Sequence, residues 1–297
     1  MKAKVKYLSD RLAFALLQNN LQSHLAKGYK MTIGFCSKKI DVDAEGFAKT
    51  LYCKQRWCAT CGRINTAKMI NGYQSQLSDF SEPYFLTLTL ETVSGENLKN
   101  RIQTMEKEWG KILVNNRNNK FFDTMNGIRK MECTLRPGGM YHYHFHILID
   151  GKAQAEWILE QWFKRFPLIK KSKSAQDLRP ADERSYKEIF KYFTKPLAQD
   201  SGLFTEERGV TQFKRLDFLY RVLYGKRIFQ PFGKVKREKE YEWDTEKAIQ
   251  IPKGKEGLVW SWIKNDWWSE WGEALADFTP DESLEKLLRH TPKDVID

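Results

Sequence analysis

The chain has 297 residues, of which 41% are hydrophobic, so it can bury a full core as one large domain or two smaller ones. It contains no apolar run of about 18 residues and no N-terminal apolar segment with a small-residue cleavage site, which argues against a membrane-spanning or secreted class. We therefore expect a cytoplasmic protein with no membrane partner. In that compartment cysteines are more often metal ligands or reactive thiols than disulfides.

Positive charge is concentrated in the first four fifths of the chain. The whole sequence carries a formal net charge of +12. Residues 238–297 hold 15 acidic and 8 basic residues, a net of −7, which leaves 42 basic and 23 acidic residues, a net of +19, in residues 1–237. This excess is larger than solubility requires, and it is typical of proteins that bind a polyanion, of which nucleic acid is the commonest.

Four of the five cysteines follow a predicted helix over residues 8–26. Cys58 and Cys61 form a Cys-x2-Cys pair, in which a tight loop holds two thiolates at the spacing that tetrahedral Zn²⁺ needs. Cys53 and Cys36 complete the set, and Cys36 is the more distant in sequence. Four thiolates leave no open position for a substrate, so the predicted zinc is structural. The alternative is a group of buried free cysteines.

The following segments alternate between helix and strand. Helices are predicted over residues 65–79 and 96–114, where apolar side chains recur at helical spacing. Between them, residues 84–91 alternate Leu with Phe and Thr, which is the pattern of a half-buried strand. A further helix is predicted over residues 153–166, and a basic loop over residues 168–173 follows it.

Residues 141–150 read Tyr-His-Tyr-His-Phe-His-Ile-Leu-Ile-Asp and hold three of the five histidines. Alternate side chains of a strand point the same way, so one face presents His142, His144 and His146, and the other presents aromatic and aliphatic groups to the core. One or two such histidines would need no special role. Three in register indicate a metal or catalytic site, because imidazole is the commonest metal-ligand side chain.

This strand is predicted to pair with residues 128–136 in a β-hairpin around Pro137-Gly138-Gly139, a strong turn signal. Pairing about Gly138 places Glu132 opposite His144, because both residues are six positions from it. One carboxylate and two imidazoles form an open site for a divalent ion. A register slipped by one residue would remove Glu132 from this face, and a salt bridge is its alternative role.

A third group of residues belongs to a helix predicted to begin near residue 183 and to end at Pro196. Glu188, Tyr192 and Lys195 occupy positions i, i+4 and i+7, which form one stripe of one face. Alone, a polar stripe with a tyrosine is typical of a solvated face. The histidine site earlier in the chain favours a chemical role instead.

The chain stays basic to residue 237 and then changes in composition. Residues 211–224 carry mixed helical and strand signals, and the nearby basic residues predicted to contact DNA are Arg215, Lys226 and Arg227. The acidic tail, residues 238–297, is predicted to be helical. Its aromatic side chains stand among acids, so we expect them to pack against the protein or a partner rather than to stack on bases. Six of the ten tryptophans lie in it: Trp243, Trp260, Trp262, Trp267, Trp268 and Trp271.

Together these motifs resemble the replication initiator proteins of small rolling-circle plasmids from Gram-positive bacteria, within the HUH endonuclease superfamily. His144-Phe145-His146 matches the two histidines around a bulky apolar residue. The cysteine segment ending at Cys61 resembles the family's N-terminal cluster, and residues 85–89 resemble its first motif. Glu188, Tyr192 and Lys195 match its third motif.

The likeness extends to residues 223–233, which resemble the segment after the third motif, and spans residues 36–236 in the family's order. Two features depart from it. The family often has proline where this chain has Tyr143, and the acidic tail has no counterpart.

Strands, intervening helices and the hairpin predict an α+β fold in which a central antiparallel sheet carries helices on one face. The resemblance implies that the sheet has a ferredoxin-like or RRM-like arrangement. We expect an N-terminal helix and zinc-cysteine module over residues 1–80, a nicking and joining domain over residues 81–237, and the helical tail over residues 238–297.

The resemblance also implies the function of a metal-dependent, sequence-specific, single-strand DNA endonuclease that nicks a plasmid origin. Tyr192 is then the nucleophile that forms a 5′-phosphotyrosine bond, Glu188 a base for water at termination, and Lys195 a ligand for phosphate or for the phenolate. The metal ligands implied are His144 and His146, with Glu132 or His142 completing the site. The cofactor is Mg²⁺ or Mn²⁺, and the partners are single-stranded or hairpin origin DNA with a host helicase and polymerase.

Three alternatives stay open at this point. A relaxase or transposase of the same superfamily has the same chemistry in another process. A non-catalytic zinc-containing DNA-binding protein would use the histidines structurally. A zinc hydrolase with clustered histidines is disfavoured, because His290 in the tail is the only histidine downstream of the strand.

Overall fold

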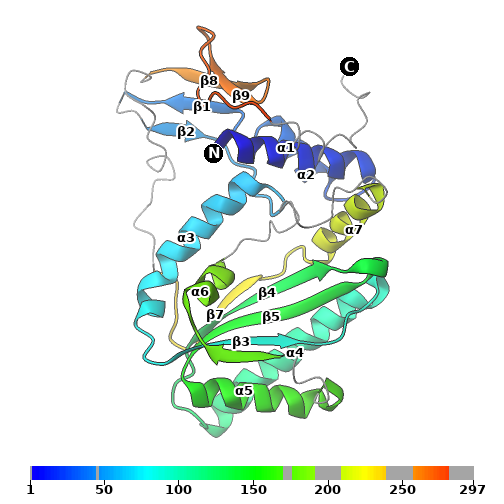
Figure 1. Ribbon diagram of the computed structural model, residues 1–297, viewed down its shortest axis with the longest axis vertical. Coiled ribbons are helices and arrows are strands. Elements are labelled where there is room, and N and C mark those ends of the chain that lie inside the picture. The colour runs from blue at the N-terminus through cyan, green and yellow to red at the C-terminus, as the bar shows by residue number, and fades with distance from the viewer. Residues whose placement is uncertain (1, 45–46, 170–175, 191–208, 239–256, 281–297) are drawn as a thin grey trace. The chain divides into compact units, whose positions relative to one another are not determined.

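The computed structural model describes residues 2–44, 47–169, 176–190, 209–238 and 257–280 (Figure 1). These residues form two compact units, each built from separate stretches of the chain. The first unit comprises the described residues of 2–65, 209–221 and 257–280, and the second those of 66–190 and 222–238. No described helix is long and apolar enough to cross a membrane.

The first unit combines helices with a small antiparallel sheet. Its N-terminal helix ends earlier than predicted, since the side-chain amides of Asn19 and Asn20 bond to the carbonyls of Ala15 and Leu16. A second helix then begins at Ala26. The sheet has the strand order β2-β1-β8-β9. The elements are α1 (Lys2–Asn19), α2 (Ala26–Gly34), β1 (Lys39–Val42), β2 (Ala48–Thr50), the start of α3 (Ala59–Ser78), α7 (Gly209–Val222), β8 (Val259–Ile263) and β9 (Asp266–Ser269).

The prediction of a helical tail is wrong for its described part, residues 257–280, which contains the hairpin of β8 and β9. Tryptophans alternate with other residues here, so Trp260 and Trp262 fall on one buried face of β8. Lys264 and Asn265 connect the two strands with φ values of 49° and 71°. Two successive positive φ values define a type I′ turn, whose twist matches that of a hairpin.

The tail tryptophans pack against the protein itself, as predicted. Trp260, Trp262 and Trp267 share a buried cluster with Tyr7 of α1 and Ile40 of β1. The indole N–H of Trp267 donates to the backbone carbonyl of residue 37 over 2.8 Å. The chain's C-terminal hairpin therefore completes a sheet and a core that begin with its N-terminal residues.

The second unit is a five-stranded antiparallel sheet with the order β6-β3-β5-β4-β7 (Figure 1). From β3 to β6, its strands and α-helices run β-α-β-β-α-β along the chain. Residues 211–224, where the sequence carried mixed helical and strand signals, are largely helical and form most of α7 of the first unit. The second unit contains the rest of α3, β3 (Pro83–Thr89), α4 (Gly95–Asn119), β4 (Gly127–Leu135), β5 (Tyr141–Asp150), α5 (Lys152–Arg165), β6 (Asp177–Pro180), α6 (Glu183–Phe190) and β7 (Phe229–Phe232).

One face of the sheet forms the core under α4 and α5 (Figure 1). Phe145 of β5 is fully buried, and its ring lies 6.2 Å from that of Trp109 on α4 and 6.1 Å from that of Trp162 on α5. Tyr143 and Ile147 alternate with the histidines and share this burial. The predicted division of the strand into an apolar face and a histidine face is confirmed.

Helices also cover part of the opposite face, so the prediction of helices on one face only is wrong. Beyond the histidines this face turns apolar at Leu148, and an apolar patch must be buried. Ile189 and Phe190 of α6 and Leu77 of α3 bury it. The histidines therefore lie at the margin of a second core rather than on an open surface.

Two candidate metal centres

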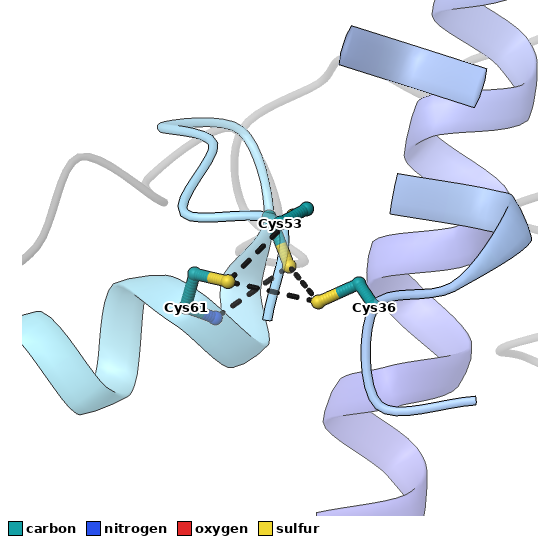
Figure 2. Close-up of side chains that lie close together, drawn as sticks. Cys36, Cys53 and Cys61 are labelled. Atoms are coloured by element: carbon teal, nitrogen blue, oxygen red, sulfur yellow. Dashed lines mark hydrogen bonds between the residues drawn. The ribbon is translucent and has the colours of Figure 1, made fainter. Parts of the chain in front are cut away.

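The four predicted cysteines of the first unit meet in one buried cluster. Figure 2 shows three of them, Cys36, Cys53 and Cys61, with their sulfurs turned toward one another. Sγ–Sγ distances of 3.6 Å join Cys36 to Cys58, Cys36 to Cys61, and Cys53 to Cys61. Bonds of 2.3 Å from sulfur to a tetrahedral Zn²⁺ would put the sulfurs about 3.8 Å apart. Disulfides need about 2.05 Å. The spacing therefore fits four ligands of one ion.

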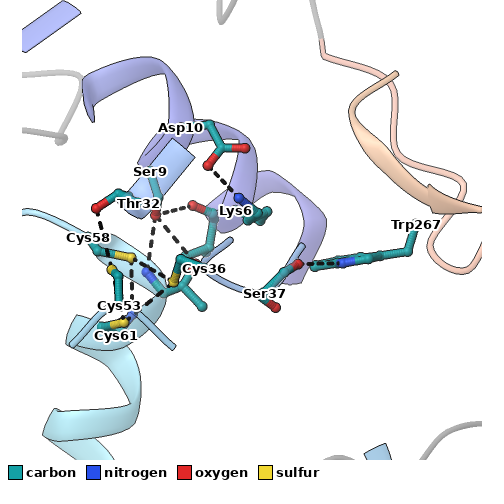
Figure 3. A network of polar contacts seen from close by, with 12 residues as sticks. Lys6, Ser9, Asp10, Thr32, Cys36, Ser37, Cys53, Cys58, Cys61 and Trp267 are labelled. Carbon is teal, nitrogen blue, oxygen red and sulfur yellow. Dashed lines mark hydrogen bonds and ion pairs between the residues drawn. The ribbon is translucent and has the colours of Figure 1, made fainter. Parts of the chain in front are cut away.

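Local structure explains why these thiols converge (Figure 3). Cys58 immediately precedes α3, Cys61 lies in its first turn, and Lys54 adopts a left-handed backbone with a φ of 55°. This turn aims the Lys54 amide at the sulfur of Cys61, at 3.2 Å, and the Thr32 hydroxyl donates to the sulfur of Cys53 at 3.4 Å. Such bonds orient ligands and stabilise thiolate charge.

The cluster is closed to solvent. Each of the four cysteines is at most 4% exposed. The hydrogen bond between Cys36 and Cys53 raises the pKa of Cys36 and lowers the pKa of Cys53. The two shifts are opposite because buried thiols this close cannot all ionise without a cation. The donor set and its burial fit a structural zinc site.

The fifth cysteine is separate from this cluster. Cys133 lies on β4 in the second unit and is also buried. Burial raises its pKa to about 12, so the thiol stays protonated at neutral pH. It therefore provides a natural control for the four clustered cysteines.

The second candidate centre lies on β4 and β5. Their register pairs Glu132 with His144, which confirms the pairing predicted about Gly138. Glu132, His144 and His146 present ligand atoms that all lie within 4.8 Å of one another. The Nε2 atoms of the two histidines are 3.1 Å apart, and Glu132 Oε2 is 3.7 Å from His146 Nε2. Neighbouring ligands of an octahedral ion with bonds of about 2.1 Å are about 3.0 Å apart. The two histidine nitrogens have this spacing, and the Glu132 carboxylate lies close enough to complete a site for a divalent ion.

His142 is not part of this group of three, although it occupies the same face of β5. Its Nε2 lies 2.9 Å from the hydroxyl of Thr89. Burial, and next the positive charge of Arg136, lower the pKa of His142, which favours its neutral form. Of the two residues proposed to complete the site, the structure brings Glu132 to the histidine pair and leaves His142 beside it.

Lys130 is a residue of this site that sequence reasoning missed. Its side chain is 5% exposed, and its Nζ lies 3.5 Å from Glu132 Oε2. The same Nζ donates to the backbone carbonyl of Glu188 on α6 over 2.7 Å. The register that pairs Glu132 with His144 also pairs Lys130 with His146, so the hairpin symmetry could have identified it.

Of the predicted third motif, the structure describes Glu188, while Tyr192 and Lys195 lie outside the described residues. Glu188 Oε1 is 3.8 Å from His146 Nε2, and its side chain is 26% exposed. The carboxylate therefore stands at the solvent side of the site. It lies next to Glu132 around the same imidazole, which makes it available either to the ion or to water.

The residues predicted to contact DNA are distributed over both units. Arg215 belongs to α7 in the first unit. Lys226 and Arg227 follow α7 in the second unit, where Lys226 pairs with Glu106 of α4 at 2.5 Å. Arg227 is exposed. Their contact with DNA stays a prediction, and the Lys226 ion pair makes Arg227 the more available of the neighbouring two.

Known proteins resemble the segment that carries most of these residues. Residues 45–165 match a family model described as Replication protein, and this segment holds Cys53, Cys58, Cys61, Glu132 and the histidine strand. Cys36 and Glu188 lie outside the matched segment.

Among curated proteins, the chain is 29% identical over 126 residues to a protein named Protein rep from Lentilactobacillus hilgardii. The alignment covers 37% of this chain and 40% of that relative, so the chain matches about two fifths of the relative's length. No solved structure matches the chain. The likeness to replication proteins therefore rests on sequence, and it agrees with the resemblance drawn from the motifs.

Proposed function

We propose that this protein initiates rolling-circle replication of a plasmid as a metal-dependent, sequence-specific endonuclease that nicks single-stranded origin DNA. The observation that carries the proposal is the convergence of Glu132, His144 and His146 on adjacent strands, at distances that suit a divalent ion. The match to replication proteins supplies the biological context. The closed cysteine cluster would hold Zn²⁺ and serve the fold.

The arrangement of the sheet supports the assignment to the HUH superfamily. The order β6-β3-β5-β4 places the fourth strand of the β-α-β-β-α-β series beside the first, and the third between the first and the second. A β-α-β-β-α-β series is the ferredoxin-like motif. The two histidines then lie on the third strand of the motif and Glu132 on the second, its neighbour in the sheet.

A divalent ion held by Glu132, His144 and His146 would offset the negative charge that builds up on the phosphoryl oxygens during attack. Mixed imidazole and carboxylate ligands favour Mn²⁺ over Mg²⁺ in affinity, and availability favours Mg²⁺. The phenolic oxygen of Tyr192 attacks the phosphorus and loses its proton. The bond from phosphorus to the 3′-oxygen breaks, and that oxygen takes up a proton and becomes the 3′-hydroxyl from which a polymerase extends.

The bond between Tyr192 and the 5′-phosphate retains the energy of the phosphodiester, so a 3′-hydroxyl can later rejoin the strand. Glu188 would take a proton from water at termination and so release the enzyme by hydrolysis. Its position 3.8 Å from His146 would keep that water close to the reacting phosphate. Lys195 would bind a phosphate or stabilise the phenolate.

The substrate would be single-stranded, either melted or extruded as a hairpin, because the scissile phosphate must reach side chains that are nine-tenths buried in the sheet. Arg215, Lys226 and Arg227 would contact phosphates outside the cleavage site. A host helicase and polymerase would act on the product.

A covalent-adduct assay tests this proposal. The full-length protein is incubated with Mn²⁺ and labelled oligonucleotides that tile both strands of the DNA carrying its gene, and adducts are separated under denaturing conditions. The wild type should form a phosphotyrosine adduct on one strand, and Tyr192→Phe should form none. Tyr186→Phe is the matched control, because Tyr186 lies on α6 and bonds to the carbonyl of Leu77.

Each other outcome has a defined meaning. An adduct that persists in Tyr192→Phe and disappears in Tyr186→Phe would move the nucleophile to Tyr186. DNA binding without an adduct on any oligonucleotide would contradict the endonuclease and favour a zinc-containing DNA-binding protein. An adduct only on a transfer origin or a transposon end would identify a relaxase or a transposase.

A further inference from the structure

Two threonines of β3 face the three histidines of β5 across the sheet. Thr87 lies opposite His146, and Thr89 lies opposite His144 and next to His142. We propose that these hydroxyls decide which histidines bind the metal: Thr87 prepares His146 as a ligand, and Thr89 withdraws His142. The inference rests on the proposed metal site and concerns how the chain selects its ligands.

Thr87 fixes the orientation of the His146 ring. Its Oγ1 lies 3.2 Å from His146 Nδ1, and Nε2, the other ring nitrogen, points to His144 and Glu132. The ring also stacks on Phe85, with centroids 5.4 Å apart. A proton on Nδ1, held by the Thr87 oxygen, leaves a lone pair on Nε2 for the ion. Metal-binding histidines commonly depend on such a bond at the remote nitrogen.

Thr89 imposes the opposite tautomer on His142. A hydroxyl has one proton, and in the proposed arrangement that of Thr89 points to the carbonyl of Leu90, 3.1 Å away. In that arrangement the hydroxyl accepts a hydrogen bond from His142 Nε2, 2.9 Å away. His142 Nε2 then carries a proton and cannot bind an ion. The remaining nitrogen, Nδ1, is buried and has no hydrogen-bond partner among the described residues.

The backbone position of Thr89 is fixed by hydrogen bonds with Gln176 and Trp162. Gln176 accepts from the Thr89 amide at 2.8 Å and donates to its carbonyl at 3.1 Å. Trp162 donates to the same carbonyl at 3.4 Å. These three bonds hold the backbone of Thr89 in place, and the contacts of its hydroxyl with Leu90 and His142 hold the side chain. Residues of β3 thus determine which two histidines are ligands and which one is not.

Nitrogen NMR of the full-length, zinc-containing protein without Mn²⁺ tests the tautomers directly. Long-range ¹⁵N–¹H spectra distinguish the two neutral forms, and pH 8 keeps histidines neutral. We expect the proton on Nδ1 in His146 and on Nε2 in His142, assigned from His146→Gln and His142→Gln. The same tautomer in both residues would overturn the inference, whatever the protein does to DNA.

Mn²⁺ titration by calorimetry tests the consequence for binding. Thr87→Val keeps the shape of the side chain and removes the hydrogen bond, so affinity should fall roughly 10- to 100-fold, while Thr87→Ser should restore it. Thr89→Val should leave the affinity within about threefold, because His142 is not a ligand. Equal affinities for Thr87→Val and wild type would refute the role of Thr87. Absence of Mn²⁺ binding in the wild type would refute the proposed function instead, and the tautomers would still be decided by NMR.

Discussion

The cysteine cluster and the histidine site are both groups of potential metal ligands, and they differ in nearly every physical respect. The cysteines supply four soft ligands that exclude water. The histidine site supplies three harder ligands, with Lys130 and Glu188 within 4 Å of them. A tetrahedral ion has no coordination position left in the first site, whereas a six-coordinate ion keeps several in the second.

If both sites hold metal as proposed, this difference would let one chain use metal both for folding and for chemistry. A closed site converts binding energy into stability of the surrounding fold. At an open site, some coordination positions of the ion stay free for the substrate. Fewer protein ligands then hold the ion, so other contacts, such as hydrogen bonds, have to keep those ligands in place. Here the hydrogen bonds of Thr87 and Lys130 do so.

The largest expected effect is the loss of the cysteine site. Cys58→Ser should remove about one zinc per chain, because three thiolates and a hydroxyl bind Zn²⁺ poorly. Structural zinc contributes roughly 10 kcal/mol or more in small domains, so the first unit should lose its fold. Metal analysis and hydrogen exchange measure the two losses.

Cys133→Ser is the control for this experiment, because Cys133 is buried and outside the cluster. It should keep the zinc. Full zinc content in Cys58→Ser, or equal loss in both variants, would contradict a four-cysteine site.

Replacement of Lys130 should destabilise the histidine site. Lys130→Met leaves the carboxylate of Glu132 buried beside an apolar side chain, which costs about 3 kcal/mol when a buried charge loses its partner. Hydrogen exchange of β4 and β5 amides would report this loss locally. Lys187→Met on α6 removes only an exposed pair with Glu183, and should cost less than about 1 kcal/mol. Similar costs for the two variants would argue against a structural role for Lys130.

The stability of the first unit should depend on pH through Asp10, which pairs with the buried Lys6. Burial raises the pKa of Asp10 from 3.8 to about 6, so the folded state holds this proton more tightly than the unfolded state. The contribution of Asp10 to the free energy of unfolding is fully present below pH 3.8 and is lost as the pH rises through about 6. It amounts to about 3 kcal/mol.

Denaturant unfolding of wild type and Asp10→Asn between pH 4 and pH 8 measures this term as a difference. The difference in unfolding free energy between the two proteins should change across the interval, with the wild type losing stability as the pH rises. A constant difference would show that Asp10 keeps an ordinary pKa in the folded protein.

The smallest effect concerns the turn of the tail hairpin. Lys264 has a φ of 49°, a conformation that asparagine tolerates better than lysine and that β-branched residues avoid. Lys264→Asn should stabilise the first unit by about 0.5 kcal/mol, and Lys264→Val should destabilise it. Thermal unfolding followed by tryptophan fluorescence compares them. The same melting temperature for both variants would argue against the type I′ turn.

Local patterns predicted which side chains form the two clusters. The Cys-x2-Cys spacing identified a zinc-like cluster, and the symmetry of the hairpin about Gly138 fixed the pairing of Glu132 with His144. Both predictions depend on residues close in sequence, where turn geometry leaves few options. Cys36 is more distant in sequence, and it was predicted as the fourth ligand because the cluster needed one further thiol.

Predictions failed where distant segments decide the structure. The tail was expected to be helical, yet β8 pairs with β1 across more than 200 residues. The roles of Thr87 and Thr89 depend on which strand lies beside β5, and a sequence alone does not supply that order. Lys130 was overlooked for a simpler reason, since a lysine among charged residues usually faces solvent.

Metal exchange would distinguish one closed and one open metal site in the same chain. The full-length protein is dialysed against EDTA, analysed for zinc and titrated with Mn²⁺, alongside Glu132→Gln. We expect about one zinc per chain to survive dialysis in both proteins, and one Mn²⁺ to bind reversibly only to the wild type. Undiminished Mn²⁺ binding in Glu132→Gln, or zinc that leaves as readily as Mn²⁺, would contradict the account.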